Sequence, residues 1–410
     1  MAAVAGLRGT GDWGTDERPK NFREMILFLN PNGDTPLTAL MSRVGKRTTD
    51  DAEYSWWDEP VTIWRGQVNG ELAAGDTTVV IDTADPTAST LDAPWGIATH
   101  LKPGDLLMVE EDTDPFTPEY LAVDTVINST TFTVKRAQAG GAAAATISDD
   151  AFLLLIGSQY AEGTPSPKAT SRNPVKYTNY TQIFKDTYEL TGTAEQTRAR
   201  TGPALQNDKK RKMWDHARGL ELAFMFGSQS EGTGDNGKPL RTTQGLRKYI
   251  PTANTTVFGA AVTISSFLDA VAPVFDWNTP AGDERVVFCG NTALNELNKV
   301  IQGDSNVQVQ YGGQIKVFGM NMREFILPQG RLLLRTHPLL NRHAVYKSSM
   351  WLVDFASLRW VPMRNRDTRF KDNIQNNDED TRKGEWRTEA GLQVDFGGLT
   401  NGYLGNVSAT

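Results

Sequence analysis

The stretch YTNYTQIFKDTYELTGTAEQTRARTGPALQNDKKRKMWDHARGLELAFMF, residues Tyr177–Phe226, predicts a long strand followed by a long helix. In its first part, apolar or aromatic residues fall on one side of the chain and polar residues on the other. The first set is Tyr180, Phe184, Tyr188 and Leu190, and the second is Thr181, Lys185, Thr187 and Glu189. A period of two indicates a β-strand with one covered face. Thr191-Gly192-Thr193 then interrupts the strand.

A long amphipathic helix is expected over residues 203–226. Pro203 suits its first turn, where the missing N–H of proline is not needed. Apolar residues recur at helical spacing and predict one buried stripe, made of Met213, Ala217, Leu220 and Phe224. Lys209–Lys212 keep the opposite side in water. At 1.5 Å per residue, the helix is about 36 Å long. A long strand that leads through a polar hinge into a long helix is a scaffold rather than a catalytic pocket.

Composition limits the classes of function. The chain has 410 residues, enough for two or three hydrophobic cores. Its net charge of -7 disfavours DNA binding as a main task, because phosphate neutralisation needs a surplus of Lys and Arg on one face. We expect neither a signal peptide nor a membrane span, since no apolar run approaches the roughly 20 residues that a span requires. The single cysteine, Cys289, excludes an internal disulfide framework and suits a reducing cytoplasm.

Residues 66–157 differ from the rest in having short strands and frequent turns. Five strands are expected there, at 77–81, 106–109, 120–126, 131–134 and 152–156. They predict a small all-β barrel or sandwich. The flanking segments Trp56–Trp64 and Tyr177–Leu190 are long and aromatic, so we expect them to pair antiparallel as a ribbon with this β-domain near its tip. A two-stranded ribbon is marginal in water on its own, and we expect it to lie on another copy of the protein.

The remaining sequence predicts an α+β fold. A helix is expected at 263–275, and a buried strand at 285–291 leads into a helix at 292–301. Further strands are expected at 315–318, 321–327, 331–334 and 350–354, and the tail alternates short strands with polar links.

No segment presents the pattern of an active site. The loop Gly232–Lys238 lacks the residue order of a phosphate-binding loop and follows a helix, so we interpret it as a surface loop. Cys289 ends an apolar strand, which favours a buried, inert thiol over a nucleophile served by His337 or His343. The four histidines lack the spacing of zinc ligands. We therefore expect no catalytic residue, no cofactor and no metal, although two carboxylates could still meet in space for sugar hydrolysis.

Five short motifs follow one another in a familiar order. They are Tyr54–Asp58 (YSWWD), Lys102–Leu107 (KPGDLL), Asn179–Phe184 (NYTQIF), Thr191–Ala194 (TGTA) and Thr243–Leu246 (TQGL). In this order, from about Met41 to the C-terminus, the chain resembles the major capsid protein of tailed bacteriophages. That family has the Johnson fold, typified by phage Hong Kong 97. The chain is similar in particular to a subfamily that carries a β-domain in its extended loop.

The resemblance implies a domain organisation. An N-terminal arm spans 1–50. The extended loop is built from 51–65 and 158–192, with the β-domain inserted at 66–157. The peripheral domain combines 193–254 with 346–410 and holds the spine helix at 203–226. The axial domain spans 255–345.

The resemblance also implies a function. Copies of the chain form homo-hexamers and homo-pentamers of an icosahedral shell, which encloses double-stranded DNA without binding it specifically. The shell is assembled in the host cytoplasm and becomes the virion capsid. Scaffolding, portal and decoration or cement proteins are the expected partners, and no membrane takes part. We can nominate no Lys–Asn pair for the covalent cross-link that some relatives form.

Two other interpretations stay open. One is an encapsulin-type compartment shell. The other is a β-rich, carbohydrate-active enzyme, in which 66–157 is a binding module and some of the 10 tryptophans stack on sugar. Size in solution separates an enzyme, which forms a small oligomer, from a shell protein. For a shell protein, we expect the aromatic residues of the extended loop to form the inter-subunit contacts, namely Trp56, Trp57, Trp64, Tyr180, Phe184 and Tyr188.

Overall fold

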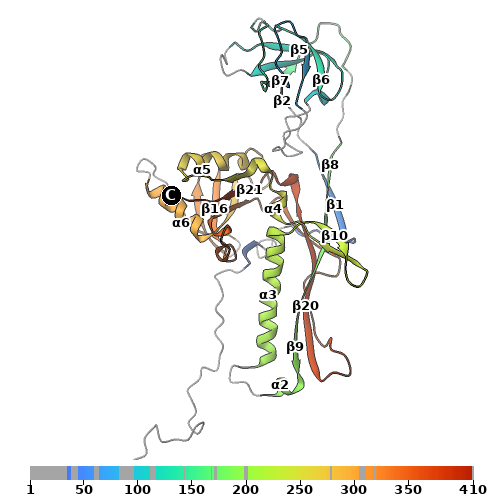
Figure 1. Cartoon of the computed structure of the whole chain (residues 1–410), viewed down its shortest axis with the longest axis vertical. Coiled ribbons are helices and arrows are strands. Elements are labelled where there is room, and N and C mark those ends of the chain that lie inside the picture. The colour runs from blue at the N-terminus through green and yellow to red at the C-terminus, as the bar shows by residue number, and fades with distance from the viewer. Residues whose placement is uncertain are drawn as a thin grey trace, which may run out of the picture.

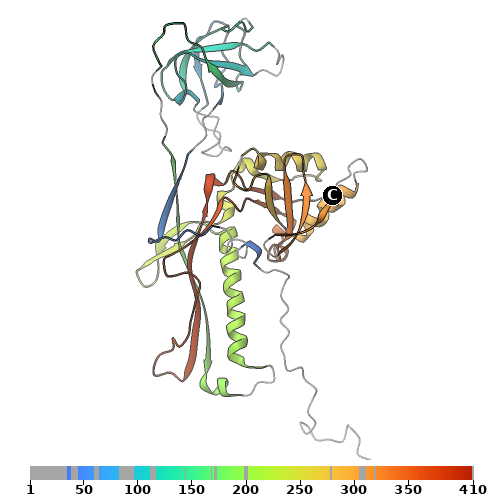
Figure 2. The same ribbon diagram turned by 180° about the vertical axis from the view of Figure 1, so that it is seen from behind.

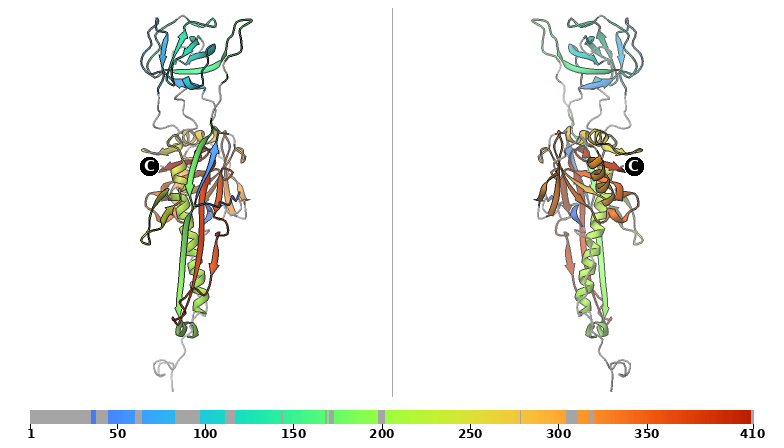
Figure 3. Two further views of the ribbon diagram at one scale, coloured as in Figure 1. Left: turned by 90° about the vertical axis from the view of Figure 1, so that its right-hand side faces the viewer. Right: turned by 90° about the vertical axis from the view of Figure 1, so that its left-hand side faces the viewer.

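The computed structural model describes residues 35–37, 45–59, 64–82, 97–110, 117–142, 144–167, 169, 173–197, 202–277, 279–303, 311–317 and 320–408. Most of the expected N-terminal arm lies outside these residues. The described chain is arranged around helix α3 (Ala204–Phe226), which is 23 residues long. A sheet containing β9 and β20 runs along one side of α3 and a second sheet lies on the other side (Figures 1 and 2). A two-stranded ribbon leads to a separate β-structure at one end of the elongated molecule, whose narrow profile Figure 3 shows.

The expected ribbon is present but shorter than predicted. Strand β1 (Glu53–Asp58) pairs antiparallel with β8 (Val175–Tyr180). The pairing ends at Thr181, whose N–H donates to the carbonyl of Ala52 at 2.8 Å. Beyond it, β9 (Gln182–Thr191) pairs with β20 (Thr381–Val394) instead of β1. The prediction of one strand over Tyr177–Leu190 was therefore wrong, because the chain changes sheets at Thr181.

Helix α3 packs on the four-stranded sheet that β20 organises. One edge of β20 pairs with β9, and the other pairs with β18 (Leu358–Pro362) and β19 (Arg369–Lys371). The short helix α2 (Gly192–Gln196) follows β9 and is capped by Thr191, whose side chain accepts from the N–H of Ala194. The ring of Phe224 meets Phe184 and Trp360 edge-on, with centroids 6.3 and 5.1 Å away.

The limits predicted for the long helix are confirmed to within one residue, but half of its predicted stripe was wrong. Met213 is 41% exposed and Ala217 is only half-buried. The buried residues are His216, Leu220, Glu221, Phe224 and Met225. Two of these five residues, His216 and Glu221, are polar. A search for apolar residues at helical spacing passes over them, so the predicted buried face was rotated away from the observed one.

The second sheet has seven strands and belongs to the region expected to be axial. Its order is β12 (Thr255–Val257), β21 (Gly402–Gly405), β17 (Met350–Val353), β13 (Glu284–Cys289), β16 (Arg331–Thr336), β15 (Met320–Ile326) and β14 (Tyr311–Val317). Strands β17 and β21 come from the segment that the sequence analysis assigned to the peripheral domain. Both strands belong to the seven-stranded sheet instead. Strand β17 pairs antiparallel with β13, and β21 pairs antiparallel with β17.

Helices and short helical turns surround this sheet. The α-helices are α4 (Leu246–Tyr249), α5 (Ile264–Val271) and α6 (Asn291–Gly303). The 3-10 turns of this region are η2 (Thr252–Asn254), η3 (Ala272–Phe275), η4 (Leu340–Arg342), η5 (Tyr346–Ser348) and η6 (Asp395–Gly398). Thr263 caps α5 in a capping box with Ser266. The segment expected to be one helix over 263–275 changes to 3-10 form at η3, which contains Pro273. A hairpin of β10 (Ser230–Thr233) and β11 (Pro239–Thr242) carries the expected surface loop.

The inserted segment forms a closed barrel. Its strands follow the order β2 (Arg65–Gln67), β7 (Phe152–Ser158), β4 (Asp105–Glu110), β5 (Tyr120–Val126), β6 (Thr131–Lys135) and β3 (Thr78–Val80), with the turn η1 (Ile97–Thr99) beside them. A bridge between Val68 and Ile81 joins the two outer strands and closes the sheet. The five expected strands are present, and β2, which directly follows the segment Trp56–Trp64 that was assigned to the ribbon, was missed. A core including Val79, Leu107 and Phe132 fills the barrel.

A buried polar contact joins α3 to the axial sheet. Glu221 of α3 and His337, which follows β16, are both fully enclosed. The Nε2 of His337 lies 2.8 Å from Oε1 of Glu221, and the same oxygen accepts the N–H of Leu37 at 2.8 Å. A buried carboxylate needs such donors, because water cannot reach it. This contact therefore fixes three distant segments against one another.

We predict that Glu221→Ala lowers the free energy of unfolding by about 3 kcal/mol, because the N–H of Leu37 and the ring of His337 lose their acceptor in a buried site. Urea unfolding followed by tryptophan fluorescence measures the change. Glu162→Ala is the control, since this exposed side chain should change stability by less than about 0.5 kcal/mol. Equal effects of the two substitutions would contradict the structural role of Glu221.

Candidate assembly surfaces

The six aromatic residues predicted to contact a neighbour lie in different environments. Trp56 is only 4% exposed, with Tyr54 and Tyr177 stacked 6.0 Å from it on either side. Tyr188 is equally buried and stacks on Phe370. Both residues fill the core of their own chain and offer little surface to a neighbour, and their role as inter-subunit contacts stays a prediction.

The other four residues leave some surface free. Phe184 is half-buried against Phe224, and Tyr180 is half-buried with the guanidinium of Arg241 5.9 Å from its ring centre. Trp57 and Trp64 are 59% and 57% exposed. Large apolar side chains are seldom left so open without a partner when they occur together. Trp57 and Trp64 are therefore the strongest candidates of the six.

Sequence reasoning missed another exposed apolar residue near the ribbon. Leu240 of β11 is 61% exposed, on a hairpin that was interpreted only as a surface loop. The contact of Arg241 with Tyr180 brings this hairpin beside the end of β8. The only sequence signal was one leucine between polar residues, which does not by itself distinguish an assembly contact from an ordinary exposed leucine.

Cys289 is enclosed, as predicted. Its side chain has no exposed surface, and burial raises the pKa of the thiol well above its ordinary value. A thiolate is therefore disfavoured at neutral pH. Neither histidine considered as its base serves it: His337 contacts Glu221, and His343 lies at the surface beside Tyr346.

The side chains of Thr388, His216 and Asp186 are hydrogen-bonded in the arrangement of a catalytic triad, with a hydroxyl, an imidazole and a carboxylate in sequence. Nδ1 of His216 is 2.8 Å from Oδ2 of Asp186, and its Nε2 is 2.7 Å from Oγ1 of Thr388. Thr388 is fully buried, and its hydroxyl also contacts that of Thr368 at 2.9 Å. A substrate cannot reach this hydroxyl without unpacking the sheet. The group instead ties α3 to β9 and β20. Sequence reasoning missed it because its members lie far apart in the chain.

No group of three His, Cys, Asp or Glu side chains among the described residues could hold a metal ion. Within the same part of the chain, none of the helices combines the length and the apolar character needed to cross a membrane.

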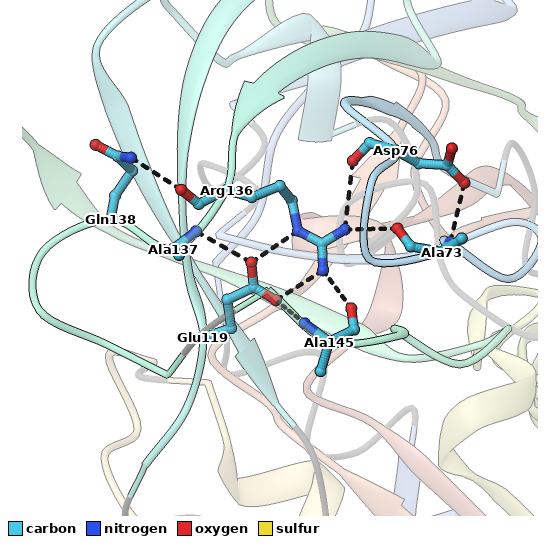
Figure 4. A network of polar contacts seen from close by, with 7 residues as sticks. All are labelled: Ala73, Asp76, Glu119, Arg136, Ala137, Gln138 and Ala145. Carbon is cyan, nitrogen blue, oxygen red and sulfur yellow. Dashed lines mark hydrogen bonds and ion pairs between the residues drawn. The ribbon is translucent and has the colours of Figure 1, made fainter.

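A buried ion pair closes one side of the barrel (Figure 4). Arg136 meets both carboxylate oxygens of Glu119 at 2.7 Å, and each side chain is less than a tenth exposed. The guanidinium also donates to the carbonyls of Ala73, Asp76 and Ala145. Burial alone would raise the pKa of Glu119, but the hydrogen bonds from Arg136 and the N–H of Ala137 outweigh it and lower the pKa. The pair therefore holds three loops of the barrel together.

Comparisons with known proteins extend over nearly the whole chain. The model of a family described as SU10 major capsid protein matches residues 6–396. The chain is 29% identical over 377 residues to a major capsid protein of Pseudomonas phage PaMx41, a match that covers 90% of this chain and 84% of that one.

Solved structures also resemble it. The capsid of Myoviridae phage XM1 is 10% identical, with a TM-score of 0.45, and the match covers 95% of this chain and 97% of that one. The holo-SrpI encapsulin complex from Synechococcus elongatus PCC 7942 is 9% identical, with a TM-score of 0.41, over 58% of this chain and 77% of that one. With TM-scores below 0.5, these likenesses add nothing to the family match.

For the barrel, we predict that Arg136→Met lowers the free energy of unfolding by about 3–5 kcal/mol at pH 7, because Glu119 stays buried without its partner. The folded pKa of Glu119 lies below its unfolded value, so its ionised form stabilises the fold above about pH 4.3. This contribution is lost as the pH falls through the lower, folded pKa. The difference in the free energy of unfolding between wild type and Arg136→Met should therefore become smaller in acid.

Calorimetry of the full chain at pH 7 and in acid measures both effects. The control is Lys135→Met, which removes an exposed ion pair with Asp124. It should lower the free energy of unfolding by less than about 1 kcal/mol. A loss of stability that does not change with pH would contradict the role of the Glu119 carboxylate.

Proposed function

Because the chain belongs to the family of SU10 major capsid proteins, we propose that its copies assemble as homo-hexamers and homo-pentamers into an icosahedral shell around double-stranded phage DNA. The match of the family model over residues 6–396 is the observation that carries this proposal. The chain is a shell-forming structural protein of a phage capsid, and its fold is α+β of the Hong Kong 97-like type. The family match favours a phage capsid over an encapsulin-type compartment.

The ribbon supports assembly between copies. Among the described strands β1 and β8 pair only with each other. One face of the ribbon packs on the core of its own chain through Tyr54 and Trp56, and the opposite face, which carries Trp57, is open to a neighbouring copy. Trp57 of β1 and Trp64, which precedes barrel strand β2, each have more than half of their surface exposed. A neighbouring copy that covers the two tryptophans would bury their apolar surface and support the ribbon. Tyr180 and Phe184 offer only partial surfaces to such a contact.

Charge supports enclosure of DNA without specific binding. The chain carries a net charge of -7, which repels phosphate at long range. Its basic run on α3 is partly engaged within the chain: Lys209 lies 3.5 Å from the ring centre of Phe370, and Lys212 is 3.5 Å from Asp215. Portal, scaffolding and decoration or cement proteins, and assembly in the host cytoplasm before the virion forms, are parts of the same proposal.

We divide the chain into functional parts on the same basis. The ribbon is the core of an extended loop, α3 and the four-stranded sheet form a peripheral domain, and the seven-stranded sheet forms an axial domain that also takes β17 and β21. The barrel, residues 66–157, is an inserted domain on the outside of the shell. Its acidic residues Glu110, Asp149 and Asp150 disfavour a position against packaged DNA.

The tryptophans provide a test of assembly through the ribbon. Trp57→Ala combined with Trp64→Ala should leave the fold intact, since both side chains are exposed. If a neighbour covers them, each acts as an interface anchor worth about 2 kcal/mol, which raises the concentration needed for assembly more than tenfold. Circular dichroism checks the fold, and sedimentation velocity measures assembly. Ile127→Ala, an equally exposed residue of the barrel, is the control. Unchanged assembly of the double variant would refute this contact.

The inserted domain provides a second test. Replacement of residues 67–157 by a short Gly/Ser link should leave the rest of the chain folded, because the barrel has its own core. It should also lower the temperature at which particles break, if the barrel contacts a neighbouring copy. Loss of folding elsewhere would show that the segment belongs to the main core. Particles of unchanged stability would show that the barrel contributes no contact between copies.

A further inference from the structure

Two exposed surfaces of opposite charge lie at opposite ends of the axial sheet. The first, here called the acidic hollow, is formed where β13 begins and β15 turns into β16. The second, here called the basic loop, is the segment 340–348 that follows β16, together with Arg247. Each surface has one exposed aliphatic residue among its charges, Ile326 in the hollow and Val345 in the loop.

The acidic hollow has a volume of about 440 Å³. Its charged residues are Asp283, Glu284, Glu324 and Arg331. Arg331 contacts both Glu284 and Glu324, so three carboxylates face one guanidinium and the net charge is -2. Asp283 is exposed and forms no ion pair with any described residue. Ile326, 58% exposed, adds an apolar wall.

The basic loop has a matching composition. Arg342 and Lys347 are exposed, and within the described chain neither forms an ion pair. Arg247 adds a third cation, since its Nη1 donates to the hydroxyl of Tyr346 at 2.9 Å. The segment 340–348 contains no Asp or Glu, which leaves a net charge of +3 around Val345 with Arg247 included. Val345 itself is 61% exposed.

The register of the sheet fixes where these surfaces lie. Strands β13 and β16 run parallel, with Glu284 beside Arg331 at one end and Cys289 beside Thr336 at the other. The hollow lies at the first end and the basic loop follows the second. Six residues of strand separate them by about 20 Å. One copy cannot bring its own two surfaces together across that sheet, but two copies placed head to tail can.

We propose that the acidic hollow of one copy receives the basic loop of the next copy, with Val345 against Ile326 and the cations of the loop facing Asp283. The inference rests on the proposed function, because it names the surfaces through which neighbouring copies meet. When the hollow and the loop of one copy meet two different neighbours, the contact is heterologous, and its repetition generates a ring where the rotation between copies closes. The two charges, -2 and +3, are complementary, and each surface is repelled by a second copy of itself. Charge thus disfavours contacts between two hollows or between two loops and favours contact of a hollow with a loop.

A charge exchange tests this pairing in the full chain. Arg342→Glu with Lys347→Glu changes the loop from +3 to -1, so that it faces the hollow with like charge. Like charges across an interface are strongly unfavourable, and the concentration needed for assembly should rise at least about tenfold. Gln329 is a neutral residue that also lines the hollow. Asp283→Lys with Gln329→Lys changes the charge of the hollow from -2 to +1. The variant that combines all four substitutions should recover most of the assembly lost by the first pair.

Light scattering against protein concentration and electron microscopy provide the readouts, and circular dichroism checks that each variant is folded. Lys185→Glu with Lys371→Glu is the matched control, since it changes the net charge by the same amount at exposed positions of β9 and β19, outside the axial sheet. It should assemble as the wild type does.

The outcomes separate this inference from the proposed function. If wild-type protein assembles and the loop variant assembles equally well, the two surfaces do not meet and the inference is wrong. The same holds if the combined variant shows no recovery, or if the control is impaired as much as the loop variant. Failure of the wild type to assemble at all would overturn the proposed function, and this inference with it.

Discussion

Glu221 of α3 is a carboxylate enclosed away from water, and two of its donors come from segments far away in the chain. One is the ring of His337, which follows β16, and the other is the N–H of Leu37. If the axial sheet moved away from α3, the carboxylate would lose the His337 donor in a buried site. The position of the axial sheet on the long helix is therefore defined by a polar contact inside an apolar core. The same core includes Phe224, Phe288 and Trp351.

A second polar group fixes the other side of the helix. His216 lies one helical turn before Leu220 and contacts both Asp186 of β9 and Thr388 of β20. The helix is thus held against the four-stranded sheet at His216 and against the axial sheet at Glu221. A subunit of a shell must transmit contact forces from one neighbour to the next without deforming. A long helix fixed on two sides by buried polar contacts meets that requirement.

Much of the fold could be predicted from local pattern. The limits of α3, five of the six barrel strands and the strand–turn–helix unit of β13 and α6 follow from periodicity and turn residues, which depend only on neighbours in sequence. The change of sheet at Thr181 could not be predicted, because β8 and β9 form one continuous pattern and their different partners lie far along the chain. The same holds for His216 and Glu221, since a polar residue on a helix reads as exposed until its partner is known. Among the predicted contacts, Trp56 and Trp57 are adjacent and chemically identical. Only the pleat of β1 and the core beneath it decide that one is buried and the other exposed.

This chain builds a closed shell from copies of itself. Electron cryomicroscopy of the purified full-length protein is the decisive measurement. We expect closed particles with icosahedral symmetry, in which the seven-stranded sheets gather around the five-fold and quasi-six-fold axes. A uniform population of monomers or small oligomers, with no closed particle at any concentration or salt condition tried, would contradict it.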